Sequence, residues 1–304
     1  MPKLFLQRIK GNSYFCTGVL SIGVYIHNNI AIIIDSGGDE NCAKDISKAI
    51  QEAGYSIGAI INTHCHPDHC GGNAYFQKNI SNLSIYATHD EQLFIENTTL
   101  APRCFCGLAT PFEGLQNKYI APQKTSKITH PIVPYEDQTI VINGVSFKIV
   151  TLPGHTPGMI GIITPDNILY SGDALFGEST IEKHPILFYT DIQKTLDSFE
   201  KINNLNIDGC LLVHGGPVYD IAAITKRHIS KIIETKESIL CHLENQSLSI
   251  DELTQRVMLQ HSIGNNIVAF TLTQTTVRAY LSYLESKQHI ILNVTDGLLR
   301  ATIR

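Results

Sequence analysis

Short apolar segments alternate with helical patterns over the first two thirds of this 304-residue chain. The apolar segments are rich in isoleucine, valine and leucine, which is typical of buried or half-buried strands. They lie at 29–35, 57–62, 83–87, 145–152, 167–173 and 209–214. Helical patterns lie between them, at roughly 41–53, 67–78 and 191–204. This alternation predicts an α/β domain built from layers of helix and sheet.

Residues 98–135 interrupt the alternation. The segment contains five prolines and mixes aromatic residues with Gly, Thr and Lys. Regular structure is hard to sustain in such a sequence, and an excursion of this length is typical of a lid, an interface or a disordered loop. The side chains of Phe105, Phe112 and Tyr119 favour an ordered cover over a solvated linker.

The last third has a different pattern. A long helical stretch at 222–244 leads to Ser249 and Glu252, which have the spacing of a capping box at the start of a further helix. An apolar stripe at helical intervals follows over 277–284, and the chain ends in a hairpin pattern that closes on Asp296–Gly297.

This order of elements predicts a small winged-helix-like domain. We therefore expect a catalytic domain over 1–221, in which 98–135 is a lid or interface insertion, and a helical linker with the winged-helix-like domain over 222–304. The sequence leaves open whether the protein forms a homodimer, because the C-terminal region could pack against either the catalytic domain or a neighbouring subunit.

Composition limits the classes of partner. Hydrophobic residues make up 43% of the chain and charged residues 17%, which is enough to form a sizeable core. The net charge of −5 gives no overall attraction to nucleic acid or to anionic membranes. No stretch approaches the roughly 18 apolar residues that span a bilayer, and the start has no apolar signal segment. We expect a cytoplasmic protein whose eight scattered cysteines stay reduced.

The most informative motif is "INTHCHPDHCGG" at 61–72, which follows one of the predicted strands. In extended backbone, His64 and His66 face the same side of the strand end. Pro67 suits the first turn of a helix, on which Asp68 and His69 project in different directions. Crowded histidines repel one another when protonated, whereas neutral imidazoles and a carboxylate are good metal ligands. The cluster therefore predicts a metal site.

Four further positions share one arrangement, in which an apolar strand is followed by an acid or a histidine with glycine nearby. They are Asp35, His155, Asp173 and His214. Any one of them alone would be read as an ordinary hydrogen-bonded residue. Their recurrence is informative, because polar groups at strand ends can converge at one edge of a layered fold.

With these motifs in this order, the chain resembles the metallo-β-lactamase-fold hydrolase superfamily over residues ~15–220. The resemblance implies an αββα sandwich with two metal ions at one edge. It implies that one ion is held by the three histidines His64, His66 and His155. By the same resemblance, the other ion is held by Asp68, His69 and His214. Asp173 would bridge the two ions, and Asp35 would support the metal-binding loop without binding metal.

The C-terminal layout resembles, more loosely, the subgroup that contains β-lactamase-like protein 2. True β-lactamases of the superfamily are exported and lack an aspartate at the bridging position. Because Asp173 is present here, the resemblance disfavours antibiotic hydrolysis as the native task. The family's usual "PGHG" before the last histidine ligand is replaced by "LVHGG" around His214.

The predicted chemistry is attack by a metal-bound hydroxide on a small-molecule ester, thioester, lactone or amide. Asp68 or Asp173 would handle the proton. Zinc is favoured because the predicted ligands are rich in imidazole, and iron or manganese stays open because a carboxylate bridge also suits these metals. We expect His184 and Tyr189, which follow the Asp173 turn, to contact the substrate.

Two other classes of function compete with a small-molecule hydrolase. A ribonuclease or phosphodiesterase would use the winged-helix-like domain to bind nucleic acid, but neither part of the chain has an obvious basic stripe. A docking protein with a vestigial site is disfavoured by the complete set of predicted ligands. A thioesterase like glyoxalase II is a poor match, because that enzyme's helical C-terminal part supplies basic residues to glutathione.

Overall fold

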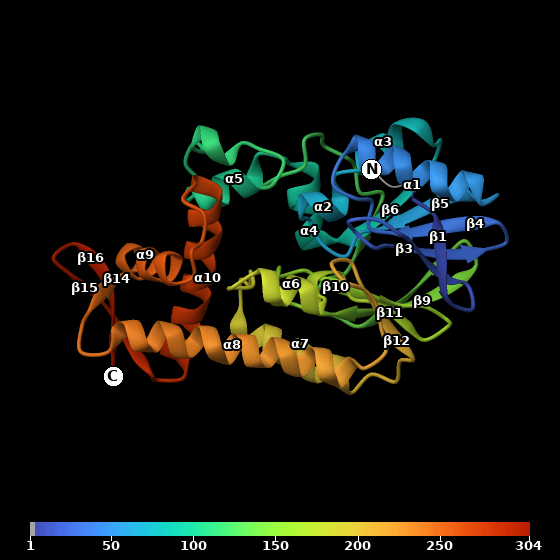
Figure 1. Ribbon diagram of the computed structural model, residues 1–304. Coiled ribbons are helices and arrows are strands. Elements are labelled where there is room, and N and C mark those ends of the chain that lie inside the picture. The colour runs from blue at the N-terminus through green and yellow to red at the C-terminus, as the bar shows by residue number, and fades with distance from the viewer. Residues whose placement is uncertain (1–3) are drawn as a thin grey trace.

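The computed structural model describes residues 4–304. Two mixed sheets pack face to face, and helices cover the outer face of each (Figure 1). The first sheet has the strand order β1-β2-β3-β4-β5-β6-β7 and the second β13-β12-β11-β10-β9-β8. This is the αββα sandwich that the sequence predicts.

The first sheet and its helices are formed by residues 6–132. Its strands are β1 (Leu6–Lys10), β2 (Ser13–Cys16), β3 (Ile22–His27), β4 (Ile30–Ile34), β5 (Ser56–Ile61), β6 (Ser84–Thr88) and β7 (His130–Ile132). The connecting helices are α1 (Glu40–Glu52), α2 (Pro67–Cys70), α3 (Asn73–Asn79), α4 (His89–Glu96), α5 (Leu100–Phe105) and the short η1 (Glu113–Leu115). Strands β4 to β7 run parallel, so their carboxyl ends lie at one edge.

The second sheet follows. Its strands are β8 (Gln138–Ile142), β9 (Val145–Thr151), β10 (Ile160–Ile163), β11 (Ile168–Tyr170), β12 (Gly209–Leu212) and β13 (Gly216–Val218). The helical segments between them are η2 (Gly172–Ala174), α6 (Glu178–Lys183) and α7 (Ile192–Asn203). Strands β11 and β12 are parallel, which again places two carboxyl ends side by side.

Strand β4 shows how the sequence forms the layers. Successive side chains of a strand point to opposite faces. Ile32 and Ile34 pack between the two sheets with Phe147 of β9, whereas Ile33 packs outward against Ile46 of α1. A strand buried on both faces requires an unbroken apolar run, and this is the pattern that the sequence has at this strand.

The C-terminal region consists of the long helix α8 (Ile221–Leu243), β14 (Leu248–Ser249), α9 (Ile250–Gln260), α10 (Ile267–Ser286) and the hairpin of β15 (Ile290–Thr295) and β16 (Leu298–Ile303). Strand β16 lies between β14 and β15 in a small sheet. The predicted capping box is present at Ser249 and Glu252, and the hairpin turns at Asp296–Gly297. Buried residues of this region join one apolar cluster with α7 and the second sheet. Within residues 4–304, each helix is too short or too polar to span a lipid bilayer.

Two local expectations from the sequence are wrong. The helix predicted over 67–78 is divided into α2 and α3, because Gly71 and Gly72 pass so close to the backbone of Gly38 and Ser36 that a Cβ would lie 2.1 Å from their carbonyl oxygens. Segment 98–135 is more regular than its prolines suggest, since it includes α5, η1 and β7. Pro131 is accommodated because β7 is an edge strand, where a missing N–H breaks no ladder.

Candidate metal centre

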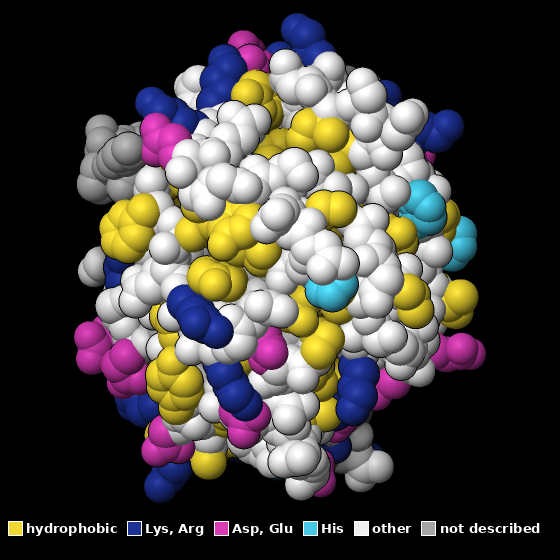
Figure 2. Space-filling view, turned by 90° about the vertical axis from the view of Figure 1, so that its right-hand side faces the viewer, with side chains coloured by type: hydrophobic (Ala, Val, Ile, Leu, Met, Phe, Trp, Pro, Cys, Tyr) yellow, Lys and Arg dark blue, Asp and Glu magenta, His cyan; other side chains and the backbone are white. Residues whose placement is uncertain are grey.

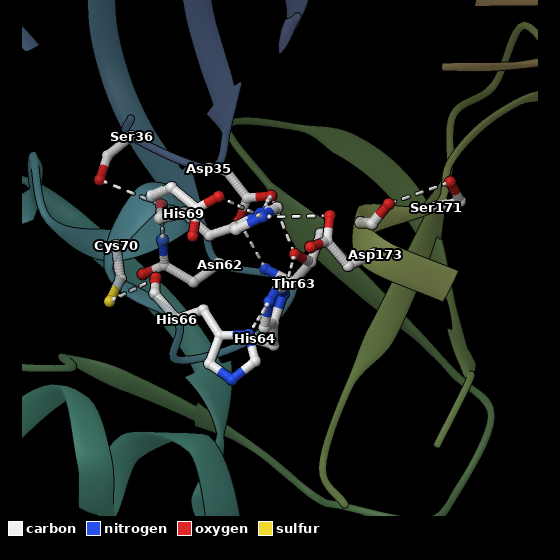
Figure 3. A network of polar contacts seen from close by, with 12 residues as sticks. Asp35, Ser36, Asn62, Thr63, His64, His66, His69, Cys70, Ser171 and Asp173 are labelled. Atoms are coloured by element: carbon white, nitrogen blue, oxygen red, sulfur yellow. Dashed lines mark hydrogen bonds and ion pairs between the residues drawn. The ribbon is translucent and has the colours of Figure 1, made fainter. Parts of the chain in front are cut away.

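The predicted site residues lie where strands end, at the edge between the two sheets. Asp35 follows β4, the 62–66 loop follows β5, and Asp173 and His214 follow the parallel strands β11 and β12. His155 comes from the loop between β9 and β10. Parallel neighbours place their carboxyl ends together, so residues that are far apart in sequence meet here. Figure 3 shows part of the resulting network.

Three histidines form the first group. Nε2 of His64 lies 3.1 Å from Nδ1 of His66, and Nε2 of His155 lies 2.8 Å from the same Nδ1. Nitrogen ligands that surround a zinc ion tetrahedrally at ~2.0–2.1 Å would be about 3.3 Å apart. The three ring nitrogens therefore converge with nearly the spacing of ligands to one ion.

Two aspartates and two histidines form the second group. Oδ2 of Asp68 lies 3.1 Å from Nε2 of His214, and Nε2 of His69 lies 3.1 Å from Oδ1 of Asp173. The ligand atoms of these four residues all lie within 4.8 Å of one another. All seven predicted ligands are thus brought together, in two groups.

Asp173 lies between the two groups. Its Oδ2 is 3.5 Å from Nε2 of His155 in the first group and 3.6 Å from Nε2 of His214 in the second. Its side chain is buried, whereas 41% of the Asp68 side chain is exposed. One carboxylate is therefore placed to face both groups, and another lies at the open side of the site.

Asp35 orients the side chains of His69 and, through Thr63, of His64 (Figure 3). Its carboxylate accepts hydrogen bonds from the backbone N–H and the hydroxyl of Thr63 and from Nδ1 of His69, each at 2.8 Å. The Thr63 hydroxyl donates its only proton to Asp35, so it accepts from Nδ1 of His64 at 3.0 Å. This leaves Nε2 of a neutral His64 with a free lone pair, which points into the first group.

The first group favours neutral imidazoles. Burial lowers the pKa of His64 well below its usual range and, with His155 alongside, lowers that of His66 to about 3. Burial also lowers the pKa of His155, whose Nδ1 donates to the carbonyl of Phe188 at 2.9 Å. One shared proton could satisfy only one pair among three converging nitrogens, whereas a cation would satisfy all of them.

The second group favours positive charge. Burial opposes charge on His69, yet Asp173 and Asp35 raise its pKa well above the usual value. Burial likewise opposes ionisation of Asp173, but His69 and His214 lower its pKa to about 2. Nε2 of His69 and Oδ1 of Asp173 are buried without a hydrogen-bond partner, although they are close together. Buried polar atoms are rarely left unsatisfied, and a divalent cation would satisfy both.

The cysteines beside these residues are not arranged as further ligands. The thiol of Cys70 donates to the backbone carbonyls of Cys65 and His66. Burial raises the pKa values of Cys65 and Cys70 well above the usual value, which disfavours the thiolates that bind metal. All eight cysteines are free.

Two cavities open beside the metal centre. The first, which we call the Asp173 cavity, has a volume of about 370 Å³ and is lined by His155, Asp173, His214 and residues of α10. The second, the His66 cavity, has a volume of about 520 Å³ and extends from His66 towards α4, α5 and α10.

The two expected substrate contacts differ in position. His184 lines the Asp173 cavity. Tyr189 does not, because its side chain is buried in the core and its hydroxyl lies 3.1 Å from Nδ1 of His228 on α8. We correct this expectation: Phe188, rather than Tyr189, lines both cavities.

Sequence reasoning missed Glu91. This buried carboxylate accepts hydrogen bonds from the backbone N–H of Cys65, the hydroxyl of Thr156 and the backbone N–H of Gly158. It thereby ties the loop of His64 and His66 to the loop of His155. It lies in the first turn of α4, where an acidic residue usually stabilises the helix from the surface, so the sequence offers no sign of this role.

The family assignment agrees with this geometry. The sequence model of the metallo-beta-lactamase superfamily matches residues 18–214. The chain belongs to the metallo-beta-lactamase superfamily. The matched residues include the whole of both metal-ligand groups and stop at the last histidine, His214.

Curated relatives within the superfamily are distant. A hydroxyacylglutathione hydrolase of Xanthomonas campestris is 27% identical over 146 residues, which cover 48% of this chain and 42% of the relative. A beta-lactamase-like protein 2 homolog of Drosophila melanogaster is 25% identical over 213 residues, which cover 69% of this chain and 63% of the relative. The chain thus spans less than two thirds of the length of these relatives.

Solved structures show the fold over the whole chain. A metallo-beta-lactamase family protein of Thermus thermophilus aligns with a TM-score of 0.71 and 17% identity and covers 100% of this chain and 99% of its own. A beta-lactamase domain protein of Burkholderia ambifaria aligns with a TM-score of 0.73 and 16% identity, over 98% and 93%. The C-terminal region therefore belongs to an arrangement that other superfamily structures share.

Proposed function

We propose that this protein is a metal-dependent hydrolase that cleaves an ester, thioester, lactone or amide bond of a small molecule. The observation that carries the proposal is the position of Asp173, whose carboxylate faces both a group of three histidines and a group with Asp68, His69 and His214. A carboxylate in this position is suited to join two ions in one site.

We assign one ion to His64, His66 and His155, the other to Asp68, His69 and His214, and the bridge to Asp173. Asp35 would orient two of the rings without binding metal. The five imidazoles favour zinc, although the carboxylates also suit iron or manganese. When bound, two divalent ions supply a water activated for attack and polarise the carbonyl oxygen of the substrate.

The side chains account for the rest of the reaction. Water adds to the acyl carbon, the bond from that carbon to the alcohol, thiol or amine breaks, and a proton must pass from the water to the leaving group. We assign this transfer to Asp68. It is the more exposed carboxylate of the site. Although burial opposes ionisation, His69 and His214 hold its pKa below the usual range, so it stays ionised as a weak base, which would hold the proton only while passing it on to the leaving group. Asp173 is buried between the two groups and would stay there as the bridge.

A small molecule fits the surroundings better than nucleic acid. Within residues 4–304, neither cavity beside the metal centre is lined by Lys or Arg, which phosphate binding requires. Figure 2 shows Lys and Arg side chains interspersed with Asp and Glu on the face that it draws, rather than a continuous basic surface. In this proposal the winged-helix-like region, residues 222–304, serves as a wall of the substrate site rather than as a nucleic-acid reader.

The test combines metal analysis with hydrolysis assays. Purified protein, chelator-stripped protein and protein reloaded with zinc, iron or manganese would be assayed on neutral ester, thioester, lactone and amide substrates, and on phosphodiesters. We expect two metal equivalents per chain, with hydrolysis of an acyl substrate that chelation removes and reloading restores. Identical behaviour of the stripped and loaded forms, or cleavage of phosphodiesters alone, would refute the proposal.

A further inference from the structure

The chemical character of the two cavities limits what the proposed hydrolase can accept. The Asp173 cavity is lined mainly by apolar groups such as Phe176 and Ile263, apart from the metal-centre residues. The His66 cavity is lined mainly by apolar groups such as Leu93 and Phe94. Each has a volume in the range of small-ligand pockets.

Away from the metal centre, the described residues that line the two cavities include no permanently cationic side chain. No Lys or Arg side chain from the described part of the chain lines either of them. The carboxylates that line the His66 cavity are those of Asp90 and Glu91. Asp90 is engaged by the hydroxyl of Tyr135, and Glu91 holds the backbone loops. A carboxylate or phosphate placed in either cavity, away from the metal centre, would lose its hydration without gaining a cationic side chain as a partner.

The two cavities meet at the metal centre along a shared wall. Phe188 and Leu272 line both cavities. At the metal centre, the Asp173 cavity is lined by His155, Asp173 and His214, and the His66 cavity is lined by His66. Helix α10 supplies Leu272, together with Thr276 for one cavity and Thr275 for the other. A scissile group at the metal centre would therefore have an apolar space on each side.

We infer that the substrate is a neutral acyl compound with apolar groups on both sides of the scissile bond, one in each cavity, and that Leu272 of α10 is a specificity residue. This rests on the proposed hydrolase function. It disfavours anionic thioesters, including those of glutathione, because their carboxylates lie away from the scissile bond and would meet no lysine or arginine among the described residues that line the cavities.

The experiment uses zinc-loaded protein and N-acetylcysteamine thioesters, whose leaving group is neutral. The acyl part runs from acetyl through butyryl to hexanoyl, and a succinyl thioester supplies a negatively charged acyl group for comparison. Burial of one methylene corresponds to about 0.8 kcal/mol, or about a fourfold rise in kcat/KM. We expect a rise on the order of a hundredfold from acetyl to hexanoyl, and succinyl to be at least tenfold poorer than butyryl.

Variants at α10 localise the effect. We expect Leu272→Ala to reduce the hexanoyl advantage over acetyl about tenfold. We expect Leu272→Lys to reverse the preference between butyryl and succinyl. Leu259→Ala, the same truncation at an exposed position of α9, is the matched control and should change neither.

The outcomes separate the inference from the function on which it rests. A flat or falling chain-length series, or a preference for succinyl or S-lactoylglutathione, would overturn the inference and leave a metal-dependent hydrolase. Unchanged selectivity in both Leu272 variants would also overturn it. Inactivity of the loaded protein towards every acyl substrate, charged and neutral, would refute the proposed function and the inference together.

Discussion

The floor and the roof of the candidate site are built differently. The floor comprises the strand-end residues of the two metal-ligand groups and Asp35, and its side chains are polar and tied to one another. The roof comprises segment 98–135, the 184–190 loop and helix α10, which line the cavities mainly with apolar side chains. The difference indicates that chemistry is fixed by the floor, and selectivity by segments that share no motif and meet only in the folded chain.

The largest effect is expected from changes in the floor. Asp173→Asn keeps the shape of the side chain but removes the charge between the two groups, so we expect kcat to fall at least about a thousandfold. Metal analysis of the same sample should show the loss of at least one equivalent. His289→Ala removes an exposed histidine and is the control. Full turnover by Asp173→Asn would contradict the role of the floor.

A smaller loss is expected for Asp35, which supports the floor without facing the cavities. Asparagine, like aspartate, tolerates the φ of 66° observed at this position, so Asp35→Asn should keep the backbone while it removes the charge that orients His69. Groups of this kind change metal affinity by roughly 10–100-fold. Zinc titration against a competing chelator would measure the change. An unchanged affinity would show that His69 needs no such support.

A change in the roof should separate selectivity from metal binding. Phe188→Leu shortens the side chain that lines both cavities, while the backbone carbonyl that accepts from His155 is retained. We expect KM for apolar substrates to rise about three- to tenfold, with kcat and metal content unchanged. A loss of metal in this variant would show that floor and roof are not separable.

The last prediction concerns stability rather than catalysis, at the contact between α8 and Phe176 of the Asp173 cavity. Nε2 of His228 accepts a hydrogen bond from the backbone N–H of Phe176 at 2.9 Å, and burial lowers the pKa of His228 from 6.5 to about 4. Between these two values the unfolded chain binds a proton that the native state excludes, so the free energy of unfolding falls as pH drops from 6.5 towards 4.

His228→Gln removes this titration and retains an acceptor. In urea unfolding, the wild type should lose roughly 2 kcal/mol more stability than the variant between pH 7 and pH 5, since each pH unit in this range corresponds to about 1.4 kcal/mol. Equal losses in the two proteins would show that His228 is not held neutral.

The sequence predicted much of the floor because local spacing determines it. The strand ends place His64 and His66 on one side, Pro67 begins α2, and the parallel strands bring Asp173 and His214 to the same edge. The apolar runs predicted a layered α/β domain, and the resemblance to the metallo-β-lactamase superfamily implied the αββα sandwich. The division at residue 221 stays a prediction, and the apolar core is continuous across it.

The roof and the buried carboxylate of Glu91 on α4 could not be predicted in this way. Glu91 has the sequence context of an ordinary acidic residue in a first helical turn, although it is buried and binds two loops. Leu272 lies in a helix whose apolar residues read as core, although it lines both cavities. Tyr189 was expected near the substrate but faces His228 instead. Which face such residues present depends on tertiary packing, and no local pattern specifies it.

The central claim is that two divalent ions lie together at the edge of the sandwich with one carboxylate between them. A crystal of zinc-loaded protein, measured on both sides of the zinc absorption edge, tests this most directly. The anomalous difference map should show two peaks of similar height, one among His64, His66 and His155 and one among Asp68, His69 and His214, with Asp173 next to both. A single peak, or two peaks of which neither adjoins Asp173, would contradict the account.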